Sequence, residues 1–328
     1  MKKLQKHLNK LSSKTAYYFL ILALFGPLSL WSQQQNLPLN REFNLFNTGL
    51  LNDVESNAHT ALQPFNQAQT KAWVNTDDEN FLMNLSKTKK DRSWFMRKLF
   101  YENFIVVDTG GFYLTIDPLM HGEFGVDKED NSGRTLYRNT RGVIVRANVG
   151  EKFSFETSVY ENQMVAPNYL NNYIRSKEAF RVVGVVPGQG RVKTFKDSGF
   201  DFAASSAVVT YAPSKRIALQ IGTGKHFIGD GYRSLLLSDY SFNYPFLKFS
   251  GTFGKNDQFQ YTKLHASLSS VIRRDLTSTP EALFERKAMS THYFNWIATK
   301  WLHIGLFEST IWQTEDSTGT SSFQAMQL

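Results

Sequence analysis

The residues best suited to chemistry lie together in residues 224–249, GKHFIGDGYRSLLLSDYSFNYPFLKF. A hydrolase could pair His226 there with Ser234 or Ser238, because a neighbouring imidazole activates a serine hydroxyl by accepting its proton. The spacing is not diagnostic of such a pair, so a lipase-type hydrolase of the outer membrane stands only as an alternative. We expect no catalytic residue in this chain.

Phosphate and metal chemistry have less support in the sequence. The glycines of residues 222–231 follow a strand pattern, but the order G-x-x-x-x-G-K-[ST] is missing and no helical pattern follows. The seven histidines are scattered and cysteine is absent. His121 between Asp117 and Glu123 comes nearest to a ligand cluster, and we interpret it as a polar loop. The sequence therefore predicts no metal, no cofactor and no disulfide.

The elements that must position these residues follow a strand pattern from about residue 104 onward. Residues 142–149 and 153–160 each alternate apolar and polar side chains around the turn at residues 150–152, which is the period of a β-strand. The same unit recurs in residues 207–221 and 247–261. A further hairpin turns near Lys300. We expect about nine or ten strands up to Trp312.

The connections between these strands fall into two classes. One set is short, near Gly150, Pro213, Asn256 and Lys300, and the other is long, at roughly 161–200, 224–245 and 269–290. Short turns at one end and long loops at the other are typical of a transmembrane outer-membrane β-barrel, and strands of about 10 residues suit a tilted crossing. Aromatic residues make up 14% of the chain, which a membrane interface would also require. A soluble β-sandwich is the alternative.

The N-terminal part predicts export and a separate region before the barrel. Residues 1–32 carry five lysines, no acid and then a short apolar run, which indicates a signal peptide rather than an uncleaved anchor. Without them, the formal net charge falls from +8 to about +3, so we expect no nucleic-acid partner. Residues 33–102 are expected to be extended at first and helical within 80–101, in a periplasmic or plug-like region. That helix has either a solvated basic face or a face on an anionic membrane.

Several segments resemble the capsule-assembly Wzi-like family of outer-membrane barrels, and most closely its gliding-motility RemB-like members from Bacteroidetes. The matching segments are NTRG at 139–142, ENQ at 161–163, VPGQG at 186–190, GKHFIGDGYRSLLLSD at 224–239, NYPFLKF at 243–249 and FESTIW at 307–312. The likeness spans most of residues 104–312, and its most specific motif centres on GDGYRSLLLSD.

The resemblance implies a non-enzymatic barrel in the outer membrane. Wzi-like barrels hold surface polysaccharide, and RemB-like proteins are associated with movement over surfaces, so the expected partners are membrane lipid and either polysaccharide or gliding-motility proteins. Family barrels are larger than this chain, and the sequence ends in SFQAMQL without a terminal aromatic residue. We therefore expect residues 103–328 to be a C-terminally truncated part of a barrel.

By this resemblance, the expected role of the opening stretch is structural or glycan-binding. The motif residues with this expected role are Gly229, Asp230, Gly231, Tyr232, Arg233, Ser238 and Asp239. We expect the glycines to permit a tight excursion at the rim. Asp230, Arg233 and Asp239 are expected to pair with one another, because charges cannot face lipid.

Two further expectations concern the wall and the lumen of the barrel. An aromatic girdle is expected at the outer interface, formed by Tyr240, Phe242, Tyr244 and Phe246. The inward side chains are expected to be Ile144, Tyr160, Arg146, Glu156, Arg216, Gln220 and Lys248, a mixture that favours a filled interior. A porin-like diffusion channel with an open lumen is the alternative function.

Overall fold

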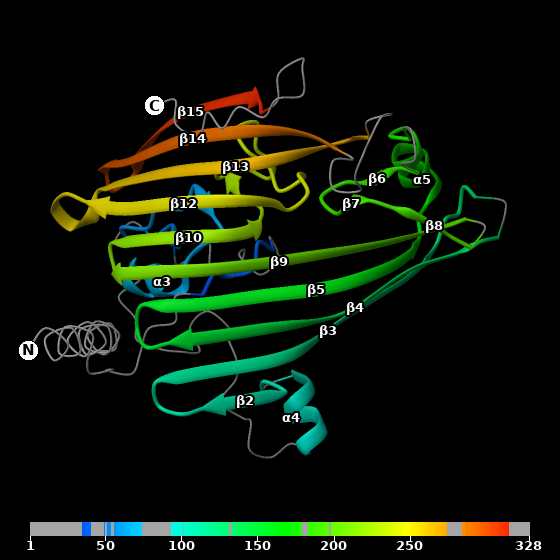
Figure 1. Ribbon diagram of the computed structural model, residues 1–328, viewed down its shortest axis with the longest axis horizontal. Helices are drawn as coiled ribbons and strands as arrows, with labels where there is room; N and C mark the ends of the chain where they lie inside the picture. Colours follow the sequence, from blue (N-terminus) through cyan, green and yellow to red (C-terminus); the bar gives the residue numbers. More distant parts are fainter. Residues whose placement is uncertain are drawn as a thin grey trace, which may run out of the picture.

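A computed structural model describes residues 35–40, 49, 51–53, 56–73, 93–100, 102–130, 133–178, 183–196, 198–273 and 284–314 (Figure 1). The signal peptide expected over residues 1–32 lies outside these residues, as do residues 80–92 of the expected helix. The described end of that helix is α4, Trp94–Phe100, which lies beside the first strands of the sheet.

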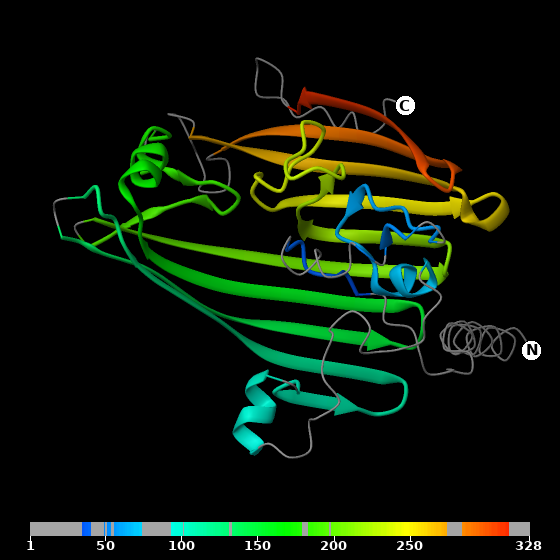
Figure 2. The same ribbon diagram turned by 180° about the vertical axis from the view of Figure 1, so that it is seen from behind.

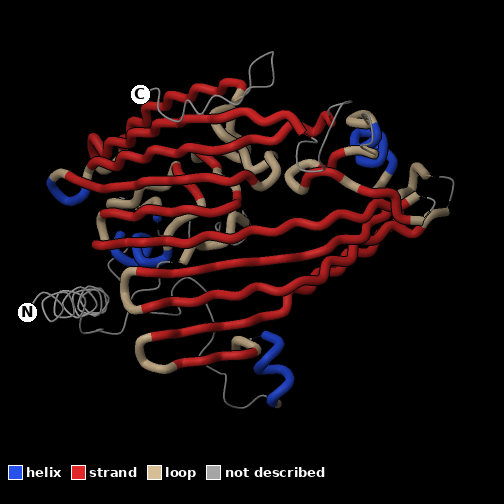
Figure 3. Tube along the Cα trace, viewed as in Figure 1, coloured by secondary structure: helices blue, strands red, loops and turns tan. Residues whose placement is uncertain are grey.

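One antiparallel sheet dominates the described chain, and it confirms the all-β expectation (Figure 3). Its long strands are β3 (Phe112–Val126), β4 (Thr135–Val149), β5 (Phe153–Val165), β9 (Gly199–Ser214), β10 (Ile217–Gly224), β12 (Tyr244–Phe253), β13 (Phe259–Arg273), β14 (Phe284–Thr299) and β15 (Leu302–Gln313). The short strands β2 (Ile105–Asp108) and β8 (Lys193–Phe195) join it. Nearly every long strand pairs with its neighbour in sequence, as period-two segments joined by tight turns should.

The sheet is open. Among the described residues its strand order runs β15-β14-β13-β12-β10-β9-β5-β4-β3-β2, with β8 added on β9, so β15 and β2 are its two edges and do not pair with each other. A closed barrel is therefore not formed by this part of the chain. The strands nevertheless follow the order that a barrel wall requires, because each long strand is antiparallel to the next.

The two faces of the sheet differ in chemistry. On one face the large apolar side chains are exposed, and this outward face carries Phe112, Val143, Phe153, Val159, Val209, Leu219, Ile221, Leu247, Phe249, Trp296 and Leu306. The alternate positions point to the other side, and this inner face includes one buried apolar cluster in β12–β14. Its buried polar side chains are Asn148, Ser154, Asn162, Thr210, Gln220, Lys248, Thr262, Thr291 and Asn295. The arrangement is the reverse of a soluble sandwich, whose apolar face is the buried one.

The N-terminal segment covers part of the inner face. From behind the sheet, the described parts of residues 35–73 lie across its middle strands (Figure 2). The segment is mostly irregular, as expected, but it ends in the short helix α3, Gln67–Trp73, and contains strand β1, Leu62–Gln63. Asn66 begins α3 by accepting hydrogen bonds through Oδ1 from the backbone N–H of Ala68 and Gln69, at 3.0 and 3.3 Å, as an N-cap does.

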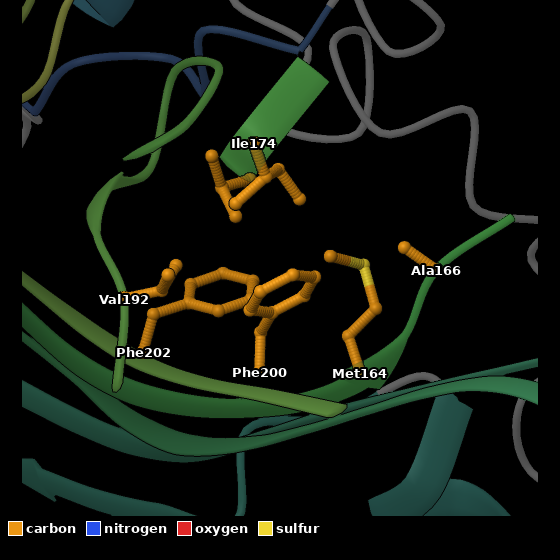
Figure 4. Packing of buried hydrophobic residues seen from close by; sticks show 7 residues of the cluster. Met164, Ala166, Ile174, Val192, Phe200 and Phe202 are labelled. Carbon is orange, nitrogen blue, oxygen red and sulfur yellow. The ribbon is translucent and has the colours of Figure 1, made fainter. Parts of the chain in front are cut away.

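The long excursion between β5 and β9 is folded around a small apolar core. It contains α5 (Asn168–Arg175) and the hairpin of β6 (Val185–Val186) and β7 (Gly190–Arg191), at the end of the sheet opposite the short turns (Figure 1). Ile174 of α5 is fully buried against side chains from both flanking strands (Figure 4). The cluster consists of Met164, Ala166, Ile174, Val186, Val192, Phe200 and Phe202. The expected loop at 161–200 is therefore a packed cap.

Some strand boundaries in the structure differ from those expected from the sequence. The connection expected at 269–290 is shorter, because β13 continues to Arg273 and β14 begins at Phe284. The turn near Lys300 and the interruption between Gly224 and Tyr244 are confirmed. None of the helices in the described ranges is long and apolar enough to cross a membrane.

Candidate functional site

The opening motif forms a loop that folds back over the inner face of the sheet. After β10 ends, strand β11, Phe227–Ile228, pairs antiparallel with β1 of the N-terminal segment. The backbone N–H of Ile228 donates to the carbonyl of Leu237 at 2.9 Å, which closes the loop on itself. Figure 2 shows this loop beside the N-terminal segment, on the side of the sheet that faces the viewer there. The motif therefore connects the sheet to the segment that covers it.

Gly229 and Asp230 make the contacts that join the loop to the N-terminal segment. Gly229 has φ +138°, a conformation that residues with a side chain rarely adopt, and its N–H donates to the carbonyl of Ala61 at 2.7 Å. Asp230 accepts a hydrogen bond from the hydroxyl of Thr60 at 2.7 Å. The expected excursion permitted by glycine is formed, and Gly231 follows at its exposed turn.

Arg233 does not pair with an acid, and the expected pairing with Asp230 and Asp239 is wrong for the described chain. Its guanidinium carbon lies 4.5 Å from the ring centre of Tyr232 and 4.4 Å from that of Tyr240, and a terminal nitrogen donates to the Tyr240 hydroxyl at 3.2 Å. The motif loop is exposed here, so water and two aromatic faces replace the counter-ion that a buried cation would need.

Ser238 and Asp239 connect the motif to the VPGQG segment. The hydroxyl of Ser238 donates to the Asp239 carboxylate at 3.2 Å. The ammonium of Lys225 donates to the carbonyl oxygens of Asp239 and Gly188, and its pKa is lowered by burial. Tyr240 accepts a backbone hydrogen bond from Gly188 at 3.1 Å. Two segments that the sequence singled out separately are thus in contact.

His226 is a structural histidine in this arrangement. It is buried, its Nδ1 lies 3.2 Å from the Tyr244 hydroxyl, and its ring packs edge-on against Phe246. Burial, with a smaller contribution from Lys248, lowers its pKa well below the usual range. Ser234 donates to the carbonyl of Ile228 and accepts from two backbone N–H groups of its own turn. In the described chain the pairing of His226 with Ser234 or Ser238 is not formed.

The expected aromatic girdle is wrong for two of its four members, Tyr244 and Phe246. Tyr240 and Phe242 are exposed, but Tyr244 and Phe246 are buried on the inner face, packed with Leu264 and Met289. The reason is the phase of β12, in which Tyr244 and Phe246 alternate with the outward Leu247.

The expected inner residues lie on the inner face, with one exception. Arg146 and Glu156 form an ion pair across β4 and β5 at 2.7 Å, and Gln220 and Lys248 are buried as a directly opposed pair. Arg216 is different, because it lies in the short turn before β10 and pairs with Asp257 of the next short turn.

The residues around His121 do not converge. His121 lies 2.7 Å from a Glu123 carboxylate oxygen, whereas Asp117 accepts from the backbone N–H of Phe104. Within the described ranges no group of three or more His, Asp or Glu side chains is placed to hold a metal ion.

Three residues of the N-terminal segment make contacts with the sheet that were not anticipated from the sequence. Gln35 donates to Asn148 at 3.3 Å, and Asn36 accepts from the Gln220 side chain at 2.8 Å. His59 is fully buried, with Nε2 2.8 Å from the carbonyl of Asp257 and Nδ1 3.1 Å from the Asn295 amide. The abundance of Asn and Gln in residues 33–70 was the only sequence signal, since such side chains suit a polar wall.

Comparison with protein-family models, with curated proteins and with solved structures finds no match to this chain. The resemblance to Wzi-like barrels therefore continues to rest on the sequence segments quoted above.

Proposed function

We propose that the sheet is part of the wall of an outer-membrane β-barrel that acts in surface-polysaccharide attachment or gliding motility and catalyses no reaction. The observation that carries the membrane assignment is the outward face, where apolar side chains of successive strands are exposed beside one another. Contiguous apolar surface of this extent is unusual on a soluble monomer, and a lipid environment would cover it. Closure in a membrane would require partners for the edges β2 and β15, because lipid cannot satisfy their backbone groups.

The covered inner face favours attachment over diffusion. The polar groups of Asn148, Gln220 and Asn295 are hydrogen-bonded to the N-terminal segment, and the motif loop is paired with that segment through β1 and β11. A diffusion channel would need this surface open to water. We therefore place the porin-like function second.

The choice of polysaccharide or a motility partner rests on the family resemblance. The geometry adds that Tyr232, Arg233 and Tyr240 form an exposed group of rings and a cation on the motif loop, which suits contact with sugar rings. Gly229, Asp230, Ser238 and Asp239 would act by holding this group in place.

Membrane fractionation followed by bilayer recording tests the proposal. We expect the protein in the outer-membrane fraction, with heat-modifiable migration, and almost no conductance in planar bilayers. Deletion of residues 35–73 should raise the conductance if that segment fills the lumen. Recovery as a soluble periplasmic protein would refute the membrane assignment, and high conductance of the intact protein would favour the porin-like alternative.

The cellular role needs a separate readout. A deletion strain should be scored both for spreading on surfaces and for retained capsule. Complementation with a Tyr232→Ala, Tyr240→Ala double variant should restore less of the affected trait than the unaltered protein does, while its level in the outer membrane stays the same. Full restoration by that variant would exclude the exposed rings from the role.

A further inference from the structure

A small cavity lies between the N-terminal segment and the inner face of the sheet. Its volume is about 20 Å³, and roughly 10–15 Å³ of such space suffices for one water-sized guest. Phe65 and Trp73 of the N-terminal segment line one side, and Gln220, Lys248 and Gln260 of the sheet line the other. The cavity is complete only while the N-terminal segment is in place.

Among the described residues that line this cavity, Lys248 alone is charged. Its residue is 3% exposed, and within the described ranges its ammonium makes neither a hydrogen bond nor an ion pair. The side-chain oxygen of Gln260, which lines the same cavity, is also buried without a partner. Buried polar groups usually have a hydrogen-bond partner, so the chemistry of this lining suits a polar or charged guest.

A positive charge on Lys248 favours an anion over a water molecule as the guest of this cavity. An ammonium buried without a counter-charge is costly and tends to lose its proton; a bound anion would favour the protonated form, whereas a neutral water supplies no charge to do so. Gln220 is neutral as well, and its amide nitrogen already donates to Asn36 and Thr210, at 2.8 and 2.9 Å, so it has no free donor for the guest. Gln260 can present its N–H₂ group to the cavity by a half-turn of its amide, which would give an anion a second donor.

We infer that this cavity binds one small monovalent anion of the size of chloride, and that the bound anion stabilises the docking of residues 56–73 on the sheet. The link follows from geometry, because Trp73 and Phe65 on the docked segment enclose a site whose cation belongs to β12. An anion that binds only the docked form favours that form by mass action.

The test compares sodium chloride with sodium gluconate at equal ionic strength, on the full chain purified in detergent. Gluconate is too large for the cavity. Chloride at about ten times its Kd should raise the midpoint of thermal unfolding by about 2–4 °C. It should also slow maleimide labelling of a Ser56→Cys variant by about tenfold. Ser56 suits this role because its hydroxyl is buried without a partner, so a thiol there loses no hydrogen bond.

Lys248→Met should remove both chloride effects, whereas Lys255→Met in an exposed short turn should keep them. If Lys248→Met does not fold, anomalous scattering from bromide in crystals of the unaltered protein decides the matter. A bromide peak beside the Lys248 ammonium supports the inference. Equal unfolding and labelling in chloride and gluconate, or an empty cavity in the bromide crystals, would overturn it while leaving the membrane assignment untouched.

Discussion

At the scale of single residues, His59 shows how one side chain holds the N-terminal segment on the sheet. Its two ring nitrogens face a carbonyl acceptor, on Asp257, and an amide, on Asn295. A neutral imidazole satisfies both, donating through Nε2 and accepting through Nδ1. A protonated ring would direct a second N–H at the amide and would carry a charge into a buried site.

Docking of the segment should therefore weaken in acid. Burial, aided by nearby His303 and opposed by Asp257, lowers the pKa of His59 from its ordinary value of 6.5. The undocked segment thus binds more protons below pH 6.5, so docking is fully favourable above that pH. Below pH 6.5, the free energy of docking becomes less favourable by up to about 1.4 kcal/mol for each pH unit. Labelling of Ser56→Cys, measured relative to Lys215→Cys in an exposed turn, should rise up to about tenfold by pH 5.5.

His59→Gln serves as the control for this effect. A glutamine keeps one donor and one acceptor but does not titrate, so the relative labelling rate should become independent of pH between 7 and 5.5. The same pH dependence in His59→Gln would assign the effect to another group.

Gly142 illustrates a second residue-scale constraint, at the end of the NTRG segment. A Cβ there would lie 2.3 Å from the carbonyl oxygen of Val159 and 2.6 Å from the Cβ of Tyr160, on the paired strand β5. Gly142→Ala should therefore lower the free energy of unfolding by about 3 kcal/mol. Gly125→Ala on β3, with nothing within 4 Å, is the matched control and should cost less than about 1 kcal/mol. Equal midpoints of urea unfolding for Gly142→Ala and Gly125→Ala would show that β4 and β5 shift to make room for the added methyl group.

At the scale of elements, the sheet has two unlike ends. One end carries the short turns, and the other carries α5 with β6 and β7, packed around Ile174 (Figure 4). In outer-membrane barrels the long connections face the outside and the short turns face the periplasm. The packed cap should therefore be the surface that meets ligands outside the cell.

Two exposed lysines test this orientation, and the absence of cysteine makes each replacement a unique label. Lys177→Cys follows α5, and Lys215→Cys lies in the short turn between β9 and β10. A membrane-impermeant maleimide added to intact cells should label Lys177→Cys alone, and both after lysis. Labelling of Lys215→Cys alone in intact cells would invert the orientation.

At the scale of the whole molecule, the outward face should meet lipid rather than water. Ile221 lies on this face between Val209 and Leu247 of the neighbouring strands, and all three are exposed. Ile221→Arg should lower the free energy of unfolding in lipid vesicles by about 2–4 kcal/mol if the residue lies near the middle of the bilayer.

Ile221→Leu, which keeps the apolar surface, should change the free energy of unfolding by less than about 1 kcal/mol. On a surface exposed to water, the arginine would also change it by only about 0.5 kcal/mol. Similar stability of the arginine and leucine variants would therefore count against a lipid-facing wall.

The strands and their faces were predictable from the sequence, because alternation is a local property of the chain. Val143 and Phe153 point outward and Arg146 and Glu156 point inward as the period of two requires. The turn near Lys300 and the excursion between Gly224 and Tyr244 were also correct, since both interrupt an alternating pattern. The boundaries at 269–290 were less accurate because polar strand ends resemble loops.

Contacts between distant segments were decided only by the tertiary structure. Arg233 has two tyrosine rings as neighbours where an acid was expected, and Tyr244 and Phe246 belong to the buried side of β12 because of its register. No local pattern indicates that β1 pairs with β11, or that His59 reaches the turn at Asp257. Such contacts depend on the path of the chain through space. The sequence therefore determines the amphipathic strands of this protein, and folding determines what covers their polar face.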